Sequence, residues 1–225
     1  MTIGSGTSIE NFAVIKSNTF IGENCRIFQG SVIGEIPQDL KFAGEKTETS
    51  IGDNTTVREF VTINRGTSAL GHTKVGKNVL LMAYCHIAHD CIVGDNVIMA
   101  NMATLGGHVE LGNWAFLGGG VLVHQFCKVG EHSLIAAGFR AVQDVPPFIW
   151  ASGEPIQYSG INNVGLKRRG FSSEERRLIK QIYMLYFRSK LPRVKALNEI
   201  KNQFSKNPLG KTIVNFIEKS NRGII

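Results

Sequence analysis

Aliphatic side chains recur at every sixth position over the first two thirds of the chain. Of the 23 positions counted in steps of six from residue 3 to residue 135, 20 are Ile, Val, Leu or Met. Four residues after them stands Ser, Thr, Ala, Val or Cys in 18 of the 20 cases, and ten are followed directly by glycine, which we expect at tight corners. This pattern predicts a parallel β-helix in which each hexapeptide forms a short strand and a corner, and three hexapeptides form a triangular coil.

The repeat is interrupted twice without losing its register. Ile33 and Ile51 are 18 residues apart, and Ile63 and Val75 are 12 apart, both multiples of six. In these intervals we expect two loops that leave the coil, at about residues 36–50 and 68–74, because proline, glycine and charged residues stand where strands would fall. In repeat proteins such insertions either lie on a binding face or are tolerated surface loops.

The six-residue pattern fades after residue 135. Pro146, Pro147 and Pro155 argue against a helix or a central strand around them. We therefore predict that the β-helix spans residues 1–147 and that residues 148–170 form a linker and a ligand-contacting loop.

The last part of the chain has helical spacing. Ser172 and Glu175 have the spacing of a capping box, and apolar residues then recur three and four positions apart. We predict a small α-helical domain over residues 171–225, with its second and third helices near 192–205 and 208–220. Such a domain would close the last coil, whose backbone would otherwise be unpaired.

Charge divides the chain of 225 residues, whose net charge is +7. Residues 1–166 hold ten basic and fourteen acidic side chains, whereas residues 167–225 hold fifteen basic and four acidic ones. A basic segment of this kind can bind a nucleic acid, a membrane surface or an acidic protein. The sequence has no stretch of about 18 apolar residues and no secretory signal pattern, so we expect no membrane span and a cytoplasmic protein.

All four cysteines occupy the small, inward column of the repeat. Two of them on one face are two coils apart, roughly 9–10 Å, which is too far for a disulfide. We expect buried, unpaired thiols in a reducing compartment. The four residues are Cys25, Cys85, Cys91 and Cys127.

Four of the six histidines are predicted to gather on one edge of the prism. Residues 18 apart stack, so His89, Gly107 and Gln125 share a column, with His108 and His124 on the same face and His86 one corner away. Such a cluster suits a metal site, general-base catalysis of acyl transfer, binding of an anionic ligand, or simply a solvated face. The spacing matches no metal-ligand pattern, so we expect no metal. In acyl transfer, the Gly107 N–H could stabilise the oxyanion.

Several segments of the sequence resemble the acyl-[acyl-carrier-protein]–UDP-N-acetylglucosamine O-acyltransferases of lipid A biosynthesis. The resemblance extends from the first residues to the C-terminus, and it implies a left-handed β-helix. GLKRRGFS is the more discriminating motif, because the hexapeptide pattern is shared by many acyl- and acetyltransferases. The segments are QDLKFAGE (38–45), TINRGT (62–67), HIAHD (86–90), ATLGGHVELG (103–112), VHQF (123–126), AVQDVPP (141–147) and GLKRRGFS (165–172).

The resemblance implies transfer of a 3-hydroxyacyl group from acyl carrier protein to the 3-hydroxyl of UDP-N-acetylglucosamine, the first step of lipid A biosynthesis. The sugar hydroxyl would attack the thioester directly, with no cofactor other than the phosphopantetheine of the carrier. By the same resemblance His89 is the catalytic base, Asp90 the carboxylate that orients it, and Gly107 the oxyanion donor. The residues implied in substrate binding are Asp39, Lys41, His86, His108, His124, Gln125, Asn162 and Arg168.

The resemblance gives these binding residues different tasks. Asp39 and Lys41 would contact the sugar, and the histidines and Gln125 would line the cleft. Asn162 and Arg168 would hold the nucleotide and its phosphates.

Two features depart from the family pattern. Where the family reads Asn-x-Glu, this chain has Val164, which puts a ribose or base contact and the choice of sugar in doubt. Family members also carry further coils before the segment that matches Met1, although every cleft motif lies downstream, so we expect the site to be present.

The resemblance also implies a groove for the acyl chain, capped by Ala136, Ala137 and Gly138. The methyl group of Ala137 would favour a shorter acyl chain than glycine at this position.

The implied partners complete the interpretation. We expect a homotrimer with clefts between neighbouring prisms, docking of the acidic acyl carrier protein on the basic C-terminal domain, and no nucleic acid. The alternatives are a catalytically weak binding or scaffold homologue and an acetyl-CoA-dependent acetyltransferase that acts on a nucleotide sugar.

Overall fold

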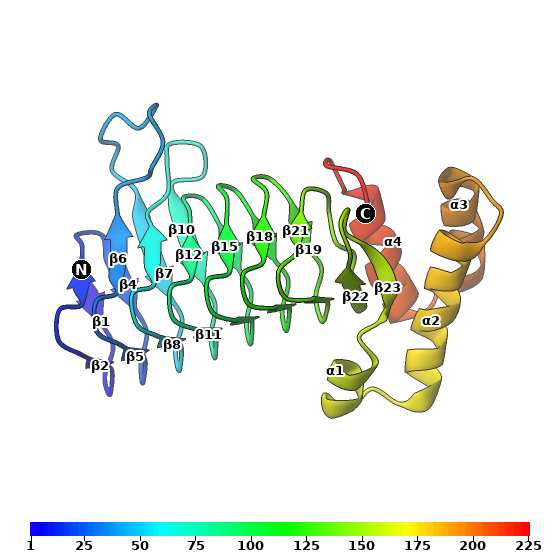
Figure 1. Ribbon diagram of the computed structural model, residues 1–225, viewed down its shortest axis with the longest axis horizontal. Helices are drawn as coiled ribbons and strands as arrows, with labels where there is room; N and C mark the ends of the chain where they lie inside the picture. The colour runs from blue at the N-terminus through cyan, green and yellow to red at the C-terminus, as the bar shows by residue number, and fades with distance from the viewer.

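The computed structural model describes residues 1–225 as an elongated prism of stacked coils with helices at one end (Figure 1). Equivalent strands of successive coils pair in parallel and build three sheets. The first sheet contains β1 (Thr2–Ile3), β4 (Thr19–Ile21), β7 (Glu48–Ile51), β10 (His72–Val75), β13 (Ile92–Val93), β16 (Glu110–Leu111) and β19 (Lys128–Val129). The second contains β2 (Ser8–Ile9), β5 (Arg26–Ile27), β8 (Thr56–Val57), β11 (Leu80–Leu81), β14 (Ile98–Met99), β17 (Phe116–Leu117), β20 (Leu134–Ile135), β22 (Ile149–Ser152) and β23 (Gln157–Ile161). The third contains β3 (Val14–Ile15), β6 (Val32–Glu35), β9 (Thr62–Asn64), β12 (His86–Ile87), β15 (Thr104–Leu105), β18 (Leu122–Val123) and β21 (Arg140–Ala141).

The interior of the prism confirms the hexapeptide register. Ile87 pairs with Ile63 on the coil before it and with Leu105 on the coil after it, as residues of one column should. The aliphatic and small columns form most of a continuous core of 47 buried residues. The four cysteines are buried in this core and free, as expected.

The corners differ from the expectation about glycine. The left-handed backbone lies three residues after 18 of the 20 aliphatic positions, as at Asn96 (φ 58°), and is rarely at the glycine that directly follows. The two exceptions, Ile36 and Gly66, lie where the loops leave the coil. That glycine serves close stacking instead: a Cβ added to Gly52 would lie 2.7 Å from the main-chain carbonyl carbon of Gly76 on the next coil. Glycine is therefore selected there by the approach of two backbones, whereas the turn itself is made by Asn, aromatic and other residues.

The two expected loops leave the coil from the same region of the prism, where Figure 1 shows them next to each other. The first spans residues 36–47, slightly less than predicted, because β7 begins at Glu48. The second spans residues 65–71, three residues earlier than predicted, because β9 ends at Asn64 and β10 begins at His72. The Arg65 guanidinium donates to the Gly34 carbonyl at 2.9 and 2.7 Å, which ties the bases of the two loops together.

The expectation that no central strand lies near the three prolines is wrong. β22 lies between β20 and β23 in the second sheet. The prolines are compatible with it because Pro146 and Pro147 precede β22 and Pro155 lies in the turn to β23, so none is required to donate to a ladder. Residues 148–170 therefore hold a hairpin and the short helix α1 (Asn163–Arg168), not only a linker.

The predicted helices are α2 (Ser173–Arg188), α3 (Arg193–Phe204) and α4 (Pro208–Glu218). The capping box is confirmed: Glu175 N donates to Ser172 Oγ at 3.1 Å, and Ser172 N donates to the Glu175 carboxylate at 2.7 Å. After α4 the chain returns to the last coil, where Ile224 pairs with Asp144. Among the helices, we find none with the length and apolar character needed to cross a bilayer.

Candidate active site

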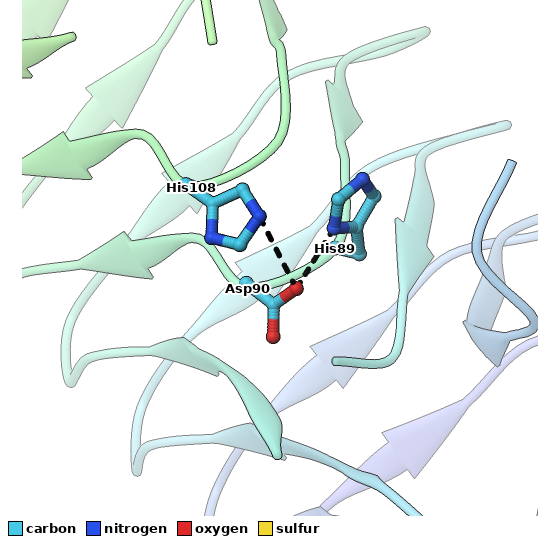
Figure 2. Close-up of side chains that lie close together, drawn as sticks. All are labelled: His89, Asp90 and His108. Carbon is cyan, nitrogen blue, oxygen red and sulfur yellow. Dashed lines mark hydrogen bonds and ion pairs between the residues drawn. The ribbon is translucent and has the colours of Figure 1, made fainter. Parts of the chain in front are cut away.

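Three titratable side chains meet at the edge between the third and first sheets (Figure 2). His89 Nδ1 lies 2.8 Å from Asp90 Oδ2, and His108 Nε2 lies 3.7 Å from the same oxygen. The two imidazole rings are perpendicular, with centroids 5.1 Å apart. The structure thus brings together three of the residues singled out in the sequence, with the carboxylate between the histidines.

The corner register explains this arrangement. Asp90 (φ 59°), His108 (φ 61°) and Phe126 (φ 66°) are 18 residues apart and occupy the left-handed corner position of successive coils. Asp and His adopt this backbone more readily than most side chains. The Phe126 ring stacks on His108 at a centroid distance of 4.5 Å, so His108 is held between an aromatic ring and the carboxylate.

The Asp90 carboxylate is buried and fully partnered. The residue is only 2% exposed. Thr67 N donates to Oδ1 at 2.9 Å and Thr67 Oγ1 donates to Oδ2 at 2.6 Å, while Asp90 N donates to Thr73 Oγ1 at 2.8 Å. Burial alone would raise the pKa of Asp90, but the hydrogen bonds from Thr67 and His89 together hold this pKa below its ordinary value. Asp90 is therefore ionised at neutral pH.

The ionised carboxylate determines the protonation of His89. Because a carboxylate only accepts hydrogen bonds, His89 Nδ1 carries the proton and Nε2 keeps a free lone pair. A Cβ added to Gly107 would lie 2.7 Å from His89 Nε2, so the ring leans over Gly107 and requires a residue without a side chain. The Gly107 N–H has no acceptor within the chain. A basic nitrogen and a free main-chain donor thus lie next to each other, which suits proton abstraction from a hydroxyl and stabilisation of an oxyanion.

The same three side chains are the only candidate metal ligands that converge in the structure, with ligand atoms within 4.8 Å of one another. However, Asp90 Oδ2 already accepts hydrogen bonds from Thr67 and His89. A cation would have to displace both donors, so the arrangement favours acid–base chemistry over metal binding.

The first loop brings two predicted sugar contacts towards this cluster. Asp39 and Lys41 line a cavity of about 240 Å³ together with Thr67 and His108. Burial lowers the pKa of His108, so its imidazole is neutral at pH 7 and can both donate and accept hydrogen bonds. The loop that interrupts the repeat therefore forms one wall of a polar cavity.

Of the remaining residues of the histidine group, His124 and Gln125 lie on the same edge, whereas His86 lies in β12, on the adjoining face of the third sheet. His86 Nδ1 is 2.7 Å from the hydroxyl of Thr62, and burial lowers the pKa of His86. His124 and Gln125 are exposed on the coils beyond Gly107. Arg222 Nη2, from the C-terminal segment, lies 3.2 Å from His124 Nδ1, a contact that no sequence pattern indicated.

Asn162 and Arg168 lie on a different edge, between the first and second sheets. They line a cavity of about 710 Å³ with Trp114 and His132. This cavity shares no residue with the two that contain His108. Within one chain, therefore, the predicted nucleotide-binding residues do not meet the histidine cluster.

Asn162 also has a structural task that the sequence did not reveal. Its side chain caps α1 by accepting from Gly165 N at 3.2 Å, and it donates to the His132 carbonyl at 2.9 Å. Arg169, one of the basic residues expected to attract the carrier protein, also has its guanidinium 5.0 Å over the Trp114 ring, a contact that the sequence did not indicate. Burial, with a contribution from Arg169, lowers the pKa of His132 to about 4, so this imidazole is neutral.

The predicted acyl-groove residues lie on the third edge, between the second and third sheets. Ala137 and Gly138 are exposed there, and Ala136 is half-buried. Towards the N-terminus the same edge carries Tyr84 and Met102, each about 60% exposed. A Cβ added to Gly138 would meet no atom within 4 Å. This edge thus carries large apolar side chains at Tyr84 and Met102, and open space at Gly138, beside the predicted groove.

The sequence matches two family models. Residues 144–225 match the model described as "Udp N-acetylglucosamine O-acyltransferase; Domain 2". Residues 72–107 match the model described as "Bacterial transferase hexapeptide (six repeats)". The two matches fall on the helical end and on the coils that carry His86, His89 and Asp90.

Curated relatives and solved structures agree with these matches. The chain is 48% identical over 209 residues to the acyl-[acyl-carrier-protein]–UDP-N-acetylglucosamine O-acyltransferase of Herminiimonas arsenicoxydans, which covers 91% of this chain and 80% of that protein. Its identity to the enzyme of the same name from Thermodesulfovibrio yellowstonii is 47%, covering 99% of this chain and 86% of that protein. LpxA from Acinetobacter baumannii superposes with a TM-score of 0.95 at 40% identity, over 99% of this chain and 87% of that chain. LpxA of Bacteroides fragilis, described as a UDP-N-acetylglucosamine acyltransferase, gives a TM-score of 0.93 at 42% identity, over 100% and 95% of the two chains.

Proposed function

The chain belongs to the acyl-[acyl-carrier-protein]–UDP-N-acetylglucosamine O-acyltransferase family, and from this we propose that it moves a 3-hydroxyacyl group from acyl carrier protein to the 3-hydroxyl of UDP-N-acetylglucosamine. This is the first step of lipid A biosynthesis. The observation that carries the proposal is the His89–Asp90 pair beside the unpartnered N–H of Gly107. We also infer that the β-helix is left-handed, on the strength of the family resemblance.

In the proposed reaction His89 acts as the general base. With Nδ1 donating to Asp90, Nε2 accepts the proton of the sugar hydroxyl as its oxygen attacks the thioester carbon. The positive charge that develops on the imidazole is stabilised by the buried carboxylate. Asp90 thus orients the ring and favours the imidazolium without itself taking the proton.

The tetrahedral intermediate would carry its negative charge on the former thioester oxygen. The Gly107 N–H supplies a hydrogen bond to that oxyanion. When the intermediate collapses, the carbon–sulfur bond breaks, the ester of the sugar remains, and the thiolate of the carrier receives the proton held by His89. His89 thus takes the proton from the sugar hydroxyl and returns it to the carrier thiolate. Because the sugar oxygen attacks the thioester directly, the reaction requires no covalent enzyme intermediate and no cofactor on the protein.

We propose that the working site is formed between copies of the chain in a homotrimer. Two observations support this. Asn162 and Arg168 lie on a different edge from His89, so one chain alone does not unite the two sets of residues. In addition, Tyr84, Met102 and other large apolar side chains are exposed on the edge between the second and third sheets, where a neighbouring prism would cover them.

The substrates would then be divided along this interface. Asp39, Lys41, His86, His108, His124 and Gln125 would hold the sugar, while Asn162 and Arg168 of a neighbouring copy would hold the nucleotide. Val164, which is 62% exposed at the rim of the second cavity, offers no hydrogen bond there. The acyl chain would run towards Ala136, Ala137 and Gly138.

We propose that the basic residues after position 166 attract the acidic acyl carrier protein. Fifteen basic against four acidic side chains in residues 167–225 support this docking surface. Buried free cysteines such as Cys91 support a cytoplasmic location.

One assay tests the function. The protein is mixed with UDP-N-acetylglucosamine and a 3-hydroxyacyl carrier, and the acylated sugar nucleotide is measured by mass spectrometry, with His89→Ala as the control. We expect product from the native protein and a loss of at least about 10²-fold in the variant. Absence of product would favour a binding or scaffold homologue, and product with acetyl-CoA in place of the carrier would favour an acetyltransferase.

A further inference from the structure

We propose that Thr67 is a positioning residue for the acyl transfer, because its hydroxyl and main-chain N–H fix the Asp90 carboxylate in the orientation that holds His89. The inference rests on the proposed function of the His89–Asp90 pair. It gives the second loop, residues 65–71, a task in the reaction.

Thr67 is the main source of hydrogen bonds to the carboxylate. Its N–H donates to Oδ1 at 2.9 Å, and its hydroxyl donates to Oδ2 at 2.6 Å. The second oxygen is also the acceptor of His89 Nδ1–H at 2.8 Å. Two donors from one residue, each on a different oxygen, prevent the carboxylate from rotating. Because His89 donates to this fixed carboxylate, the orientation of its ring is fixed as well. Figure 2 shows the carboxylate between the two rings.

The direction of the Thr67 hydroxyl is itself determined. Ala69 N donates to Thr67 Oγ1 at 3.2 Å, so the oxygen is already an acceptor on that side and its own hydrogen is free for Asp90. Thr67 is 8% exposed, and therefore water competes little for these bonds.

The loop that carries Thr67 is closed tightly. Gly71 N donates to the Thr67 carbonyl at 2.7 Å. At the base of the loop, a Cβ added to Gly66 would lie 2.6 Å from the His72 Cα, so the two stems approach as closely as glycine allows. The break in the repeat is therefore a rigid support for the carboxylate.

Removing the hydroxyl should change the chemistry of the pair. Without this donor, more negative charge remains on Oδ2, and the carboxylate attracts the imidazolium proton more strongly. The acid limb of the rate profile and the titration midpoint of the His89 imidazole should therefore both move to higher pH. Other charged groups face the pair from the neighbouring coils and loops, and they are unchanged in the variant: His108, Glu110, Lys128, Asp39, Lys41 and Glu45.

The experiment compares Thr67→Val, Thr67→Ser and Thr55→Val. Valine keeps the shape and the main-chain N–H of Thr67 but lacks the hydroxyl, and serine restores it. Thr55 is the matched control, because its buried hydroxyl also donates one hydrogen bond, to the Gly76 carbonyl at 2.9 Å, and accepts one, from Val79 N at 3.2 Å, away from the histidines. Steady-state kinetics over a range of pH and histidine-selective ¹⁵N NMR titration are measured for each.

We expect Thr67→Val to lower kcat about tenfold with little change in the KM for the sugar nucleotide. Thr67→Ser should recover most of the loss, and Thr55→Val should lose thermal stability but not kcat. A Thr67→Val enzyme with the native kcat and pH profile would overturn the inference, as would a serine variant as impaired as the valine one. If the native protein makes no product, the proposed function fails, but the NMR titration still decides whether Thr67 acts on His89.

Discussion

Replacing Gly107 with alanine tests the geometry of the proposed site more directly than removing a catalytic group. The substitution adds one methyl group and leaves the main-chain N–H, His89 and Asp90 in place. That methyl would lie 2.7 Å from both Nε2 and Cε1 of His89. Because Gly107 does not have a positive φ, alanine can adopt its backbone conformation.

The size of the effect follows from these distances. Ordinary van der Waals contact begins at 3.4 Å, so the His89 ring must retreat by roughly 1 Å, which also disturbs its 2.8 Å hydrogen bond to Asp90. A misplacement of about 1 Å in a reacting group costs about 10²-fold in rate. The unfolding free energy should change by less than about 1 kcal/mol, because the added methyl clashes only with the His89 side chain, which lies at the edge of the prism and can move.

The assay is kcat for Gly107→Ala, for His89→Ala and for the double variant. If the methyl acts through His89, it should have almost no further effect once that imidazole is gone, whereas independent effects would add in free energy. Gly119→Ala controls for folding, because it has the same position in its hexapeptide and its added Cβ would have an ordinary 3.4 Å contact. A Gly107→Ala enzyme with native kcat would refute the close approach of His89, and a large further loss in the double variant would refute the mechanism.

Four further predictions concern stability, chain length and salt. The pKa of His132 is about 4 in the folded protein and near 6.5 in an unfolded chain, so the unfolded chain binds the proton first as the pH falls. Stability should therefore decrease from pH 6.5 towards pH 4, and urea unfolding at pH 7 and 5 should show a smaller loss for His132→Phe. Asp144→Ala should lower the unfolding free energy by about 2–3 kcal/mol, since this buried carboxylate accepts from Lys128 N at 2.7 Å and Ser220 Oγ at 2.6 Å; an unchanged urea midpoint would contradict it. Ala137→Gly should shift donor preference towards longer acyl chains, which an unchanged profile across carriers of several lengths would disprove. Activity with acyl carrier protein should fall steeply as salt rises, through a higher KM for the carrier, and a flat response would argue against electrostatic docking.

The coils could be predicted from sequence because one physical requirement repeats. Each aliphatic side chain must stack inside the prism on its counterpart in the next coil, so the register is visible in residue types alone. Ile87 and Leu105, 18 residues apart, form one column with Ile63, which is 24 residues before Ile87 because the second loop intervenes. The same reliance on residue types led us to assign the repeated glycines to tight corners, whereas they serve the close stacking of coils. A pattern reports that no side chain fits at Gly52, but it does not report whether a turn or a neighbouring backbone excludes it.

Other features depend on contacts that have no fixed spacing. The strand β22 was missed because its prolines suggested irregular structure, and only the fold places them before the strand and in its turn. Thr67 is one threonine among many until the loop closes and brings it to Asp90, 23 residues away in the chain. Arg169 likewise gains significance only from the position of Trp114 on a coil far from it in sequence.

The site lies where the repeat is broken, and burial explains why. In an uninterrupted coil the corner side chain points to solvent: Asn54, Asn78 and Tyr84 are all exposed. Among the 15 non-glycine corner residues with positive φ, only Asp90 and Phe148 are buried, and each lies beside an interruption, the second loop for Asp90 and the helical end for Phe148. A carboxylate exposed like its counterparts would be screened by water and would orient an imidazole weakly. The regular coils therefore stack the reacting groups in columns, and the loop at residues 65–71 supplies the buried, hydrogen-bonded environment in which one of those corners can support a base.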